Sequence, residues 1–303
     1  MKLTKLSNGL PVWALNDLEA AVLDREVFGE QSYLKHGIQL SSGDCVFDVG
    51  ANIGVFTLFL AQTLPSLRIF AFEPVPQIFA VLDRNIVTHA ADLDIQLINV
   101  GLAGRDGTEQ FEFDPRMSPN TTMRSGDVSA SADVQAGPIP WVRAGVRDLE
   151  RIGGLSQPAS ALIQSALKVP LIGNLTAGVL VMPFVASTVK RKLMARKVAC
   201  RVTTLSKIVH AHAVETIDLL KIDVEGSEVE VLQGIGPDDW PRIRQAVVEV
   251  HDAGGRVDAI RRMFENRGFT TVVDQSEWET HKLLGIFTVY ARMASFEKTS
   301  PTP

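Results

Sequence analysis

The feature that most constrains this chain of 303 residues is an alternation of strand and helix patterns between residues 44 and 100. Short apolar runs, which suit strands buried on both faces, alternate with longer segments that have helical periodicity. The predicted strands are residues 44–50, 67–72 and 95–100, and the predicted helices are 53–64 and 77–90. This alternation is typical of a doubly wound α/β fold with a mostly parallel sheet.

The pattern resumes in the last third of the chain. Strands are predicted at residues 217–223, 245–251, 269–274 and 285–291, and a helix at 257–267. A sheet domain of this kind needs about 200 residues, so one domain can contain both stretches. The region between them is then an insertion into that domain.

The turn after the first predicted strand is the strongest indication of a ligand site. Gly50 and Gly54 occupy it, and glycine allows a backbone to approach a ligand closely. Asn52 replaces the middle glycine of a dinucleotide-binding fingerprint, which argues against a nicotinamide-dependent oxidoreductase. Glu73, at the end of the second strand, can accept hydrogen bonds from both hydroxyls of a ribose. No lysine-containing phosphate loop follows, so these features favour a nucleoside without phosphates, such as S-adenosylmethionine.

Composition narrows the possible partners. Lysine and arginine number 30 and aspartate and glutamate 35, which gives a net charge of −5. A dedicated nucleic-acid binder usually carries a surplus of positive charge, so no nucleic-acid partner is expected. The two cysteines, Cys45 and Cys200, indicate neither a disulfide framework nor a metal motif, and residues 1–10 do not read as a signal peptide. We therefore expect a cytoplasmic protein.

Five segments resemble the successive motifs of FkbM-family methyltransferases, which use S-adenosylmethionine and mostly methylate oxygen. The segments are VFDVGANIG (46–54), FEP (72–74), NVGL (99–102), LKIDVEGSE (220–228) and VEVH (248–251). Residues 26–36 and 113–118 also resemble family members from polyketide and nonribosomal-peptide assembly lines. The resemblance implies a Rossmann-like class I methyltransferase fold, with a mostly parallel seven-stranded sheet whose last strand is antiparallel.

The resemblance also implies roles for the matching residues. Four residues would line the methionine side of the cofactor and the turn beneath it: Asp48, Gly50, Asn52 and Gly54. Glu73 would bind the ribose. Three residues at the end of the third strand would lie near the adenine: Asn99, Gly101 and Leu102. Asp223 and Glu225, after the fourth strand, would face the sulfonium and the methyl acceptor.

A hydroxyl acceptor must lose a proton during methyl transfer, whereas a carboxylate acceptor need not. His251 is the expected base, because it ends the fifth strand beside Asp223 and an imidazole has an unperturbed pKa of about 6.5. Glu249 lies on the same strand face and can converge with His251 on one proton. A purely structural His251 is the alternative. Asp223, Glu225, Glu249 and His251 could also hold a divalent metal, but their spacing alone does not indicate one, and none is assigned.

The chain outside the sheet has separate expected tasks. Residues 1–40 would cover the cofactor, with Tyr33 as a candidate contact. The insertion, residues 124–200, contains a run without charges at 169–189, followed by a basic cluster. We predict a helical lid whose apolar face shapes an acceptor pocket. A membrane-spanning helix is rejected, because the flanking strands must share one aqueous domain, and a shallow membrane-surface element is the alternative.

We divide the chain into an N-terminal segment, a methyltransferase core, the insertion and a flexible tail: residues 1–40, 41–123 with 201–294, 124–200, and 295–303. The expected activity is O-methylation of a hydroxyl or carboxylate on a small or carrier-protein-tethered, lipophilic natural-product intermediate, with release of S-adenosylhomocysteine. A sugar hydroxyl on a glycan, or a non-catalytic nucleoside-binding module on the same fold, are the alternatives. No membrane partner is expected.

Overall fold

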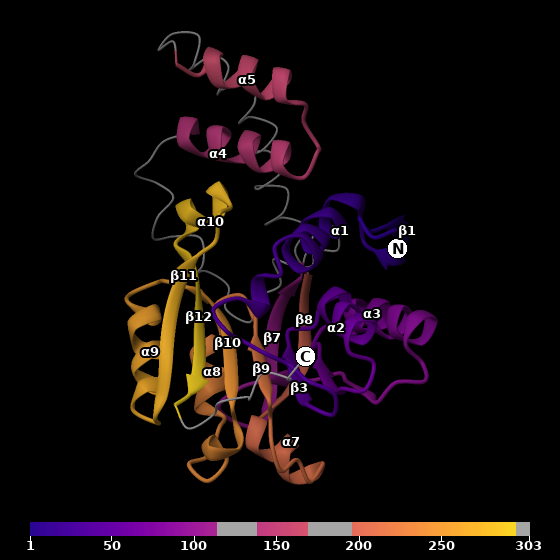
Figure 1. Cartoon of the computed structure of the whole chain (residues 1–303), viewed down its shortest axis with the longest axis vertical. Coiled ribbons are helices and arrows are strands. Elements are labelled where there is room, and N and C mark those ends of the chain that lie inside the picture. The colour runs from indigo at the N-terminus through magenta and orange to yellow at the C-terminus, as the bar shows by residue number, and fades with distance from the viewer. Residues whose placement is uncertain (114–137, 169–195, 295–303) are drawn as a thin grey trace, which may run out of the picture.

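The computed structural model describes residues 1–113, 138–168 and 196–294. Its largest sheet has seven strands: β3 (Cys45–Val49), β4 (Arg68–Phe72), β5 (Ile95–Ile98), β9 (Leu219–Ile222), β10 (Gln245–His251), β11 (Phe269–Gln275) and β12 (Ile286–Met293). Their order across the sheet is β11-β12-β10-β9-β3-β4-β5 (Figure 1).

The strand directions confirm the predicted topology. β3, β4, β5, β9 and β10 pair in parallel, and β12, the last strand of the chain, is antiparallel to both β10 and β11. The chain builds outward from β3 to β4 and β5, and then returns to β9 on the other side of β3. Ligands of open α/β sheets bind outside the carboxyl ends of the strands at such a reversal.

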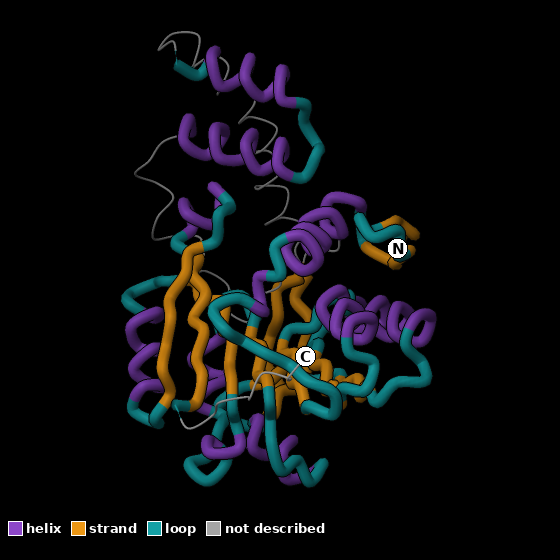
Figure 2. The backbone as a smooth tube through the Cα atoms, viewed as in Figure 1, coloured by secondary structure: helices purple, strands orange, loops and turns teal. Residues whose placement is uncertain are grey.

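Helices cover both faces of the sheet, as in a doubly wound fold (Figure 2). The described α-helices are α1 (Asp17–Asp24), α2 (Val55–Thr63), α3 (Pro76–His89), α4 (Pro138–Arg151), α5 (Gln157–Ala166), α7 (Leu205–Ala211), α8 (Glu228–Gln233), α9 (Arg256–Glu265) and α10 (Glu279–Leu284).

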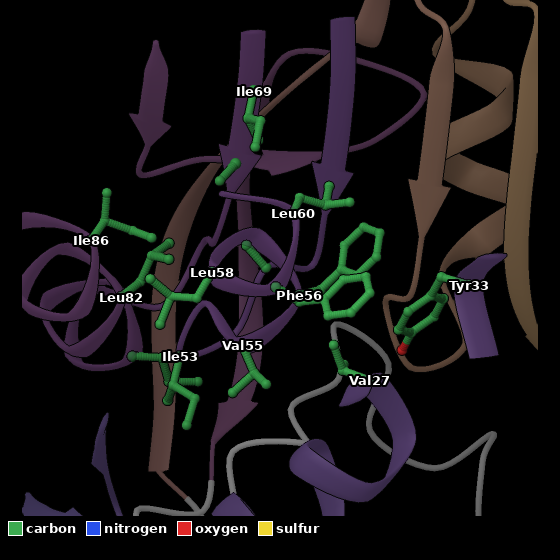
Figure 3. Packing of buried hydrophobic residues seen from close by; sticks show 14 of the residues in the cluster. Val27, Tyr33, Ile53, Val55, Phe56, Leu58, Leu60, Ile69, Leu82 and Ile86 are labelled. Atoms are coloured by element: carbon green, nitrogen blue, oxygen red, sulfur yellow. The ribbon is translucent and has the colours of Figure 1, made fainter. Parts of the chain in front are cut away.

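Alternation along the strands divides the apolar core into two layers. Val46 and Ile69 belong to the layer that includes α2 and α3, of which Figure 3 shows several members. Phe47 and Phe70, one residue further along each strand, belong to the layer that includes α7, α8 and α9. Because successive side chains of a strand point to opposite faces, short apolar runs are enough to build both layers.

The N-terminal segment has more regular structure than its sequence indicates. β1 (Lys2–Lys5) and β2 (Pro11–Ala14) form an antiparallel hairpin. α1 follows, extended by one π-helical turn (Arg25–Gly29) and then a 3-10 turn (Ser32–Leu34). The hairpin was not predicted, because each of its strands has only four residues.

A second sheet marks where the insertion leaves the core. β6 (Gly101–Leu102), β7 (Gly107–Phe113) and β8 (Arg196–Thr203) are ordered β6-β8-β7, and the antiparallel pair β7/β8 ends with Phe113 opposite Arg196. The chain therefore leaves and re-enters the core at neighbouring points. β8 begins at Arg196, a few residues before the predicted end of the insertion at residue 200.

Two sequence predictions fall on residues outside the described part of the chain. These are the charge-free run 169–189 and the tail 295–303. Of the helices that the structure does describe, none is both long and apolar enough to cross a membrane.

Candidate active site

The turns after β3 and β9 meet where the strand order reverses. Gly50 has a positive φ of 79°, and a Cβ atom there would lie 1.8 Å from the backbone oxygen of Asp223. No side chain fits at that distance, so the crossing of the two backbones requires glycine. Gly50 was expected to allow a ligand to approach closely, and in the structure it allows the Asp223 backbone to do so. This approach brings the Asp223 carboxylate to the point where the strand order reverses.

A buried ion pair supports these turns from below. Lys221 Nζ lies 3.1 Å from Asp48 Oδ1 and 3.6 Å from Asp223 Oδ2, and it donates a 2.8 Å hydrogen bond to the Gly50 oxygen. Asp48 has no exposed surface, and its Oδ2 accepts a hydrogen bond from the Thr57 hydroxyl. Burial lowers the pKa of Lys221, but the charges of Asp48 and Asp223 outweigh burial and hold it above its usual value.

This geometry places Asp48 in the turn, as predicted, and buries it completely. Asp48 supports the turn as the counter-ion of Lys221, and its contact with the cofactor stays a prediction. Lys221 was not among the residues predicted from the sequence. A lysine inside the apolar strand Leu219–Ile222 nevertheless indicates a buried ion pair, because buried lysines are almost always paired.

Glu73 follows β4, as predicted, and reaches the turn after β3. Its carboxylate accepts hydrogen bonds from the backbone N–H groups of Val75, at 2.9 Å, and Asn52. Burial raises the pKa of Glu73 to about 7, and these two hydrogen bonds oppose the shift. The Asn99 amide donates to the backbone oxygens of Glu73 and Pro74, at 2.8 and 3.1 Å. Asn99 therefore braces the turn that carries Glu73.

Three other predicted cofactor residues serve packing. Gly101 and Leu102 form β6, and the Leu102 side chain is buried in the apolar core, while its nearness to adenine stays a prediction. Gly54 caps α2 with a φ of 90°, and a Cβ there would lie 2.6 Å from Leu82 of α3. Asn52, in contrast, is only partly buried and lies beside Glu73 with a left-handed φ of 51°.

The N-terminal segment brings Tyr33 and Glu26 to the same place. The Tyr33 hydroxyl lies 2.8 Å from Glu26 Oε1 and 3.0 Å from Asp223 Oδ2. One hydroxyl proton cannot serve both carboxylates. Burial, followed by the charge of Asp223, raises the pKa of Glu26 to about 7, so a protonated Glu26 can donate to Tyr33 while Tyr33 donates to Asp223. The Tyr33 ring also packs against Phe56 of α2 (Figure 3).

His251 lies between two carboxylates. Its Nε2 is 3.1 Å from Glu225 Oε2, and its Nδ1 is 3.5 Å from Glu228 Oε1. Burial lowers the pKa of His251, but these carboxylates outweigh burial and raise it to about 11. An imidazolium that keeps its proton at neutral pH cannot act as a base. These contacts favour the alternative, a structural His251 whose positive charge positions Glu225.

Glu249 lies beside this pair on the same strand face, as the sequence predicts. Burial, and then the charges of Asp223 and Glu26, raise the pKa of Glu249 well above its usual value. Its carboxylate accepts no hydrogen bond from the described residues. Because a raised pKa makes a carboxylate a better proton acceptor, Glu249 suits the role of base better than His251.

The same residues offer two kinds of cation site. Ligand atoms of Glu225, Glu249 and His251 lie within 4.8 Å of one another, so three of the four predicted ligands could hold a divalent metal. His251 would first have to lose its proton. Without a metal, the carboxylates of Asp223, Glu225 and Glu249 form acidic surroundings that suit a sulfonium cation.

The strand order, the acid after β4, and the carboxylates after β9 and near the end of β10 are those expected of a Rossmann-like, S-adenosylmethionine-dependent methyltransferase. Residues 186–271 match the methyltransferase FkbM domain. The 31-O-demethyl-FK506 methyltransferase FkbM of Streptomyces tacrolimicus is 33% identical over 274 residues, which cover 89% of this chain and 90% of the relative. The chain therefore belongs to the FkbM methyltransferase family.

Two further relatives differ in length. Methyltransferase sdnD of Sordaria araneosa is 27% identical over 277 residues, which cover 89% of each chain. The AMB antimetabolite synthetase AmbE of Pseudomonas aeruginosa is 29% identical over 276 residues, which cover 89% of this chain but 12% of the synthetase. Similar sequences thus occur both as separate proteins and within a much longer one.

Proposed function

We propose that this protein transfers a methyl group from S-adenosylmethionine to an oxygen atom of a natural-product intermediate. The observation that carries the proposal is the convergence of Asp223 and Glu249 at the reversal of strand order, beside the buried ion pair of Lys221. Carboxylates at this position would suit both a sulfonium cation and the proton that an acceptor hydroxyl releases.

When bound, S-adenosylmethionine supplies the methyl group and leaves as S-adenosylhomocysteine with the electron pair of the broken carbon–sulfur bond. The chain's own residues have three tasks. Glu73 would hold the ribose hydroxyls, and Asp223, fixed by Tyr33 and Lys221, would face the sulfonium. Glu249 would take the proton that an acceptor hydroxyl exchanges for the methyl group.

The relatives support an acceptor from natural-product biosynthesis. One of them is named for 31-O-demethyl-FK506 and another is an antimetabolite synthetase. We infer a small or carrier-protein-tethered, lipophilic intermediate that offers a hydroxyl or a carboxylate. A sugar hydroxyl on a glycan is the second candidate, and the polar lining of the pocket beside Glu249 favours it.

We assign the insertion a lid function. Arg151 of α4 lies 3.5 Å from Glu30 in the N-terminal segment and 3.0 Å from Glu277 before α10. These contacts, and the position of α4 beyond α10 in Figure 1, support a cover on the acceptor side of the sheet. Its apolar inner face is expected from residues 169–189, outside the described part of the chain.

The other expected properties also stay predictions. A cytoplasmic location is supported by Cys45 and Cys200, which are buried free thiols. We expect neither nucleic acid nor a membrane as partner, because the net charge is −5 and a lid accounts for the apolar run.

Calorimetric titration with S-adenosylhomocysteine tests the proposal. Wild-type protein should bind it, and Glu73→Gln should weaken binding by about tenfold to a hundredfold, because hydrogen bonds to a charged group are worth about 1.5–3 kcal/mol. Glu109→Gln, in the exposed ion pair with Arg105, is the matched control. Absence of binding by the wild type, or equal affinity of Glu73→Gln, would refute the proposed cofactor site.

Turnover distinguishes an enzyme from a binding module. The first acceptor probe is 31-O-demethyl-FK506, followed by monosaccharides and hydroxy acids, with methylated product detected by mass spectrometry. Methylation of any probe excludes the non-catalytic alternative.

A further inference from the structure

A small pocket opens beside Glu249, at the ends of β10, β11 and β12 and under α10. Its lining contains only polar or aromatic side chains. The sheet contributes Glu249, Thr288 and Tyr290, and the segment after β11 contributes Trp278 and His281. The pocket thus adjoins the proposed base and contains no aliphatic side chain.

Three acids in this lining already have partners. Glu30 lies 3.3 Å from Arg25 and 3.5 Å from Arg151. Asp274 lies 2.8 Å from His36, and Glu26 lies 2.8 Å from the Tyr33 hydroxyl. Among the described residues that line the pocket, Lys35, Glu249 and His281 have hydrogen-bonding capacity left for a ligand.

The ring of His281 is held by an aromatic contact, and one of its nitrogens makes no hydrogen bond within the described part of the chain. Its ring stacks on Trp278, with 6.0 Å between the centroids and 28° between the planes. Its Nδ1 is buried and has no hydrogen-bond partner among the described residues. Burial lowers the pKa of His281 to about 4, the charge of Asp148 opposes this shift, and His251 adds to it. His281 is therefore a neutral imidazole at pH 7, and the charges of Asp223 and His251 act on it.

The insertion fixes the helix that carries His281. Asp148 of α4 accepts hydrogen bonds from the backbone N–H groups of Glu279 and Thr280, both at 2.9 Å, and from the Thr280 hydroxyl. Asp148 is itself buried, so the contact is not a loose surface pair. The position of His281 relative to Glu249 consequently depends on α4.

We propose that His281 binds the acceptor, accepting a hydrogen bond at Nδ1 from a neutral hydroxyl that lies next to Glu249, and that this contact favours a hydroxyl over a carboxylate acceptor. A hydroxyl has a proton to donate to a neutral imidazole, whereas a carboxylate has none. This inference rests on the proposed function and chooses between the hydroxyl and carboxylate acceptors left open there. His281 acts on the acceptor, and Asp148 is its positioning residue.

Nitrogen-15 NMR of histidine-labelled full-length protein, saturated with S-adenosylhomocysteine at pH 7, tests the inference. The probes are 1-propanol and propionate, which are small and nearly equal in size. Propanol should shift the Nδ1 signal of His281, which is assigned by its loss in His281→Phe. Propionate should need at least about a tenfold higher concentration for any shift. His210 of α7, which pairs with Asp239 and lies at the other end of the sheet from α10 (Figure 1), is the internal control.

Three outcomes would overturn the inference. These are a protonated His281 at pH 7, no response to propanol, and an equal or stronger response to propionate. Asp148→Ala should bind S-adenosylhomocysteine like the wild type but lose most of the propanol response, and an unchanged response would remove the positioning role of α4. Failure of the proposed function is separate, because S-adenosylhomocysteine would then not bind at all.

Discussion

The ion pair of Lys221 and Asp48 should be the most sensitive electrostatic contact in the fold. Lys221 is 3% exposed and Asp48 is not exposed at all, so neither charge is stabilised by water. Lys221→Met keeps the length and packing of the side chain but removes the ammonium. Asp48 then keeps only the Thr57 hydroxyl as a donor, and the Gly50 oxygen loses its 2.8 Å hydrogen bond.

The expected cost is large compared with that of a surface pair. Leaving one partner of a buried ion pair uncompensated costs about 3–5 kcal/mol. Lys207→Met is the matched control, because Lys207 lies 2.7 Å from Asp106 but the two side chains are 63% and 53% exposed. Exposed pairs are worth about 0–1 kcal/mol. The two methionine variants should therefore differ by several kcal/mol although both lose one lysine.

Urea denaturation at pH 7 measures both costs. Adding Asp48→Asn to Lys221→Met should restore part of the loss, since no unpaired charge is then buried. A cost below about 1 kcal/mol for Lys221→Met, or one equal to that of Lys207→Met, would refute this account of how the turns are supported.

Three further predictions follow from the same site. Glu249→Gln should lower kcat by about 10²- to 10⁴-fold without weakening S-adenosylhomocysteine binding, measured by steady-state kinetics and calorimetry. His251→Asn should instead lower the free energy of unfolding by about 3–5 kcal/mol, because Glu228 would be left buried without its cation, and a kinetic defect without loss of stability would contradict this. Burial holds the pKa of Glu73 at about 7, above the usual 4.5, so the folded state binds the extra proton between these values. Stability should therefore fall as pH rises from 4.5 to 7, by up to about 3 kcal/mol for this group, and Glu73→Gln should flatten that part of the curve.

The fold was predictable because its signals are local. Each strand of the parallel sheet is a short apolar run, and each crossover helix is punctuated by glycine or proline. Boundaries moved by only a few residues, as where α2 begins at Val55 because Gly54 is its left-handed cap. The hairpin of β1 and β2 was missed because four-residue strands leave no clear period.

The site was predicted as a set of positions but not as a set of roles. Asp48, Glu73, Asp223 and Glu249 do lie at the carboxyl ends of strands, which topology alone dictates. Whether such a carboxylate faces the reversal point or the core depends on contacts between residues far apart in sequence. Asp48, for example, is the buried counter-ion of Lys221, and the two residues are 173 positions apart in the sequence.

The same long-range contacts explain why the surroundings of His251 differ from those that its sequence position suggested. Its position beside Asp223 suggested a titrating base, but the two carboxylates that hold its proton, Glu225 and Glu228, belong to another turn. A histidine is a base only when its surroundings favour the neutral ring. The surroundings of His281 do favour the neutral ring. His281 was not predicted as a site residue, because it lies outside every motif.

The charge distribution of the cluster gives these roles a common cause. Among the described residues, Asp223, Glu225 and Glu249 lie together with Lys221 and His251 as nearby cations, and burial raises the pKa of both glutamates. Burial therefore opposes the gathering of several negative charges at this place. A sulfonium cation would offset these charges, whereas the neutral thioether that remains after methyl transfer would not. The cluster is therefore expected to favour S-adenosylmethionine over its product, and the raised pKa of Glu249 suits it to accept a proton from the acceptor.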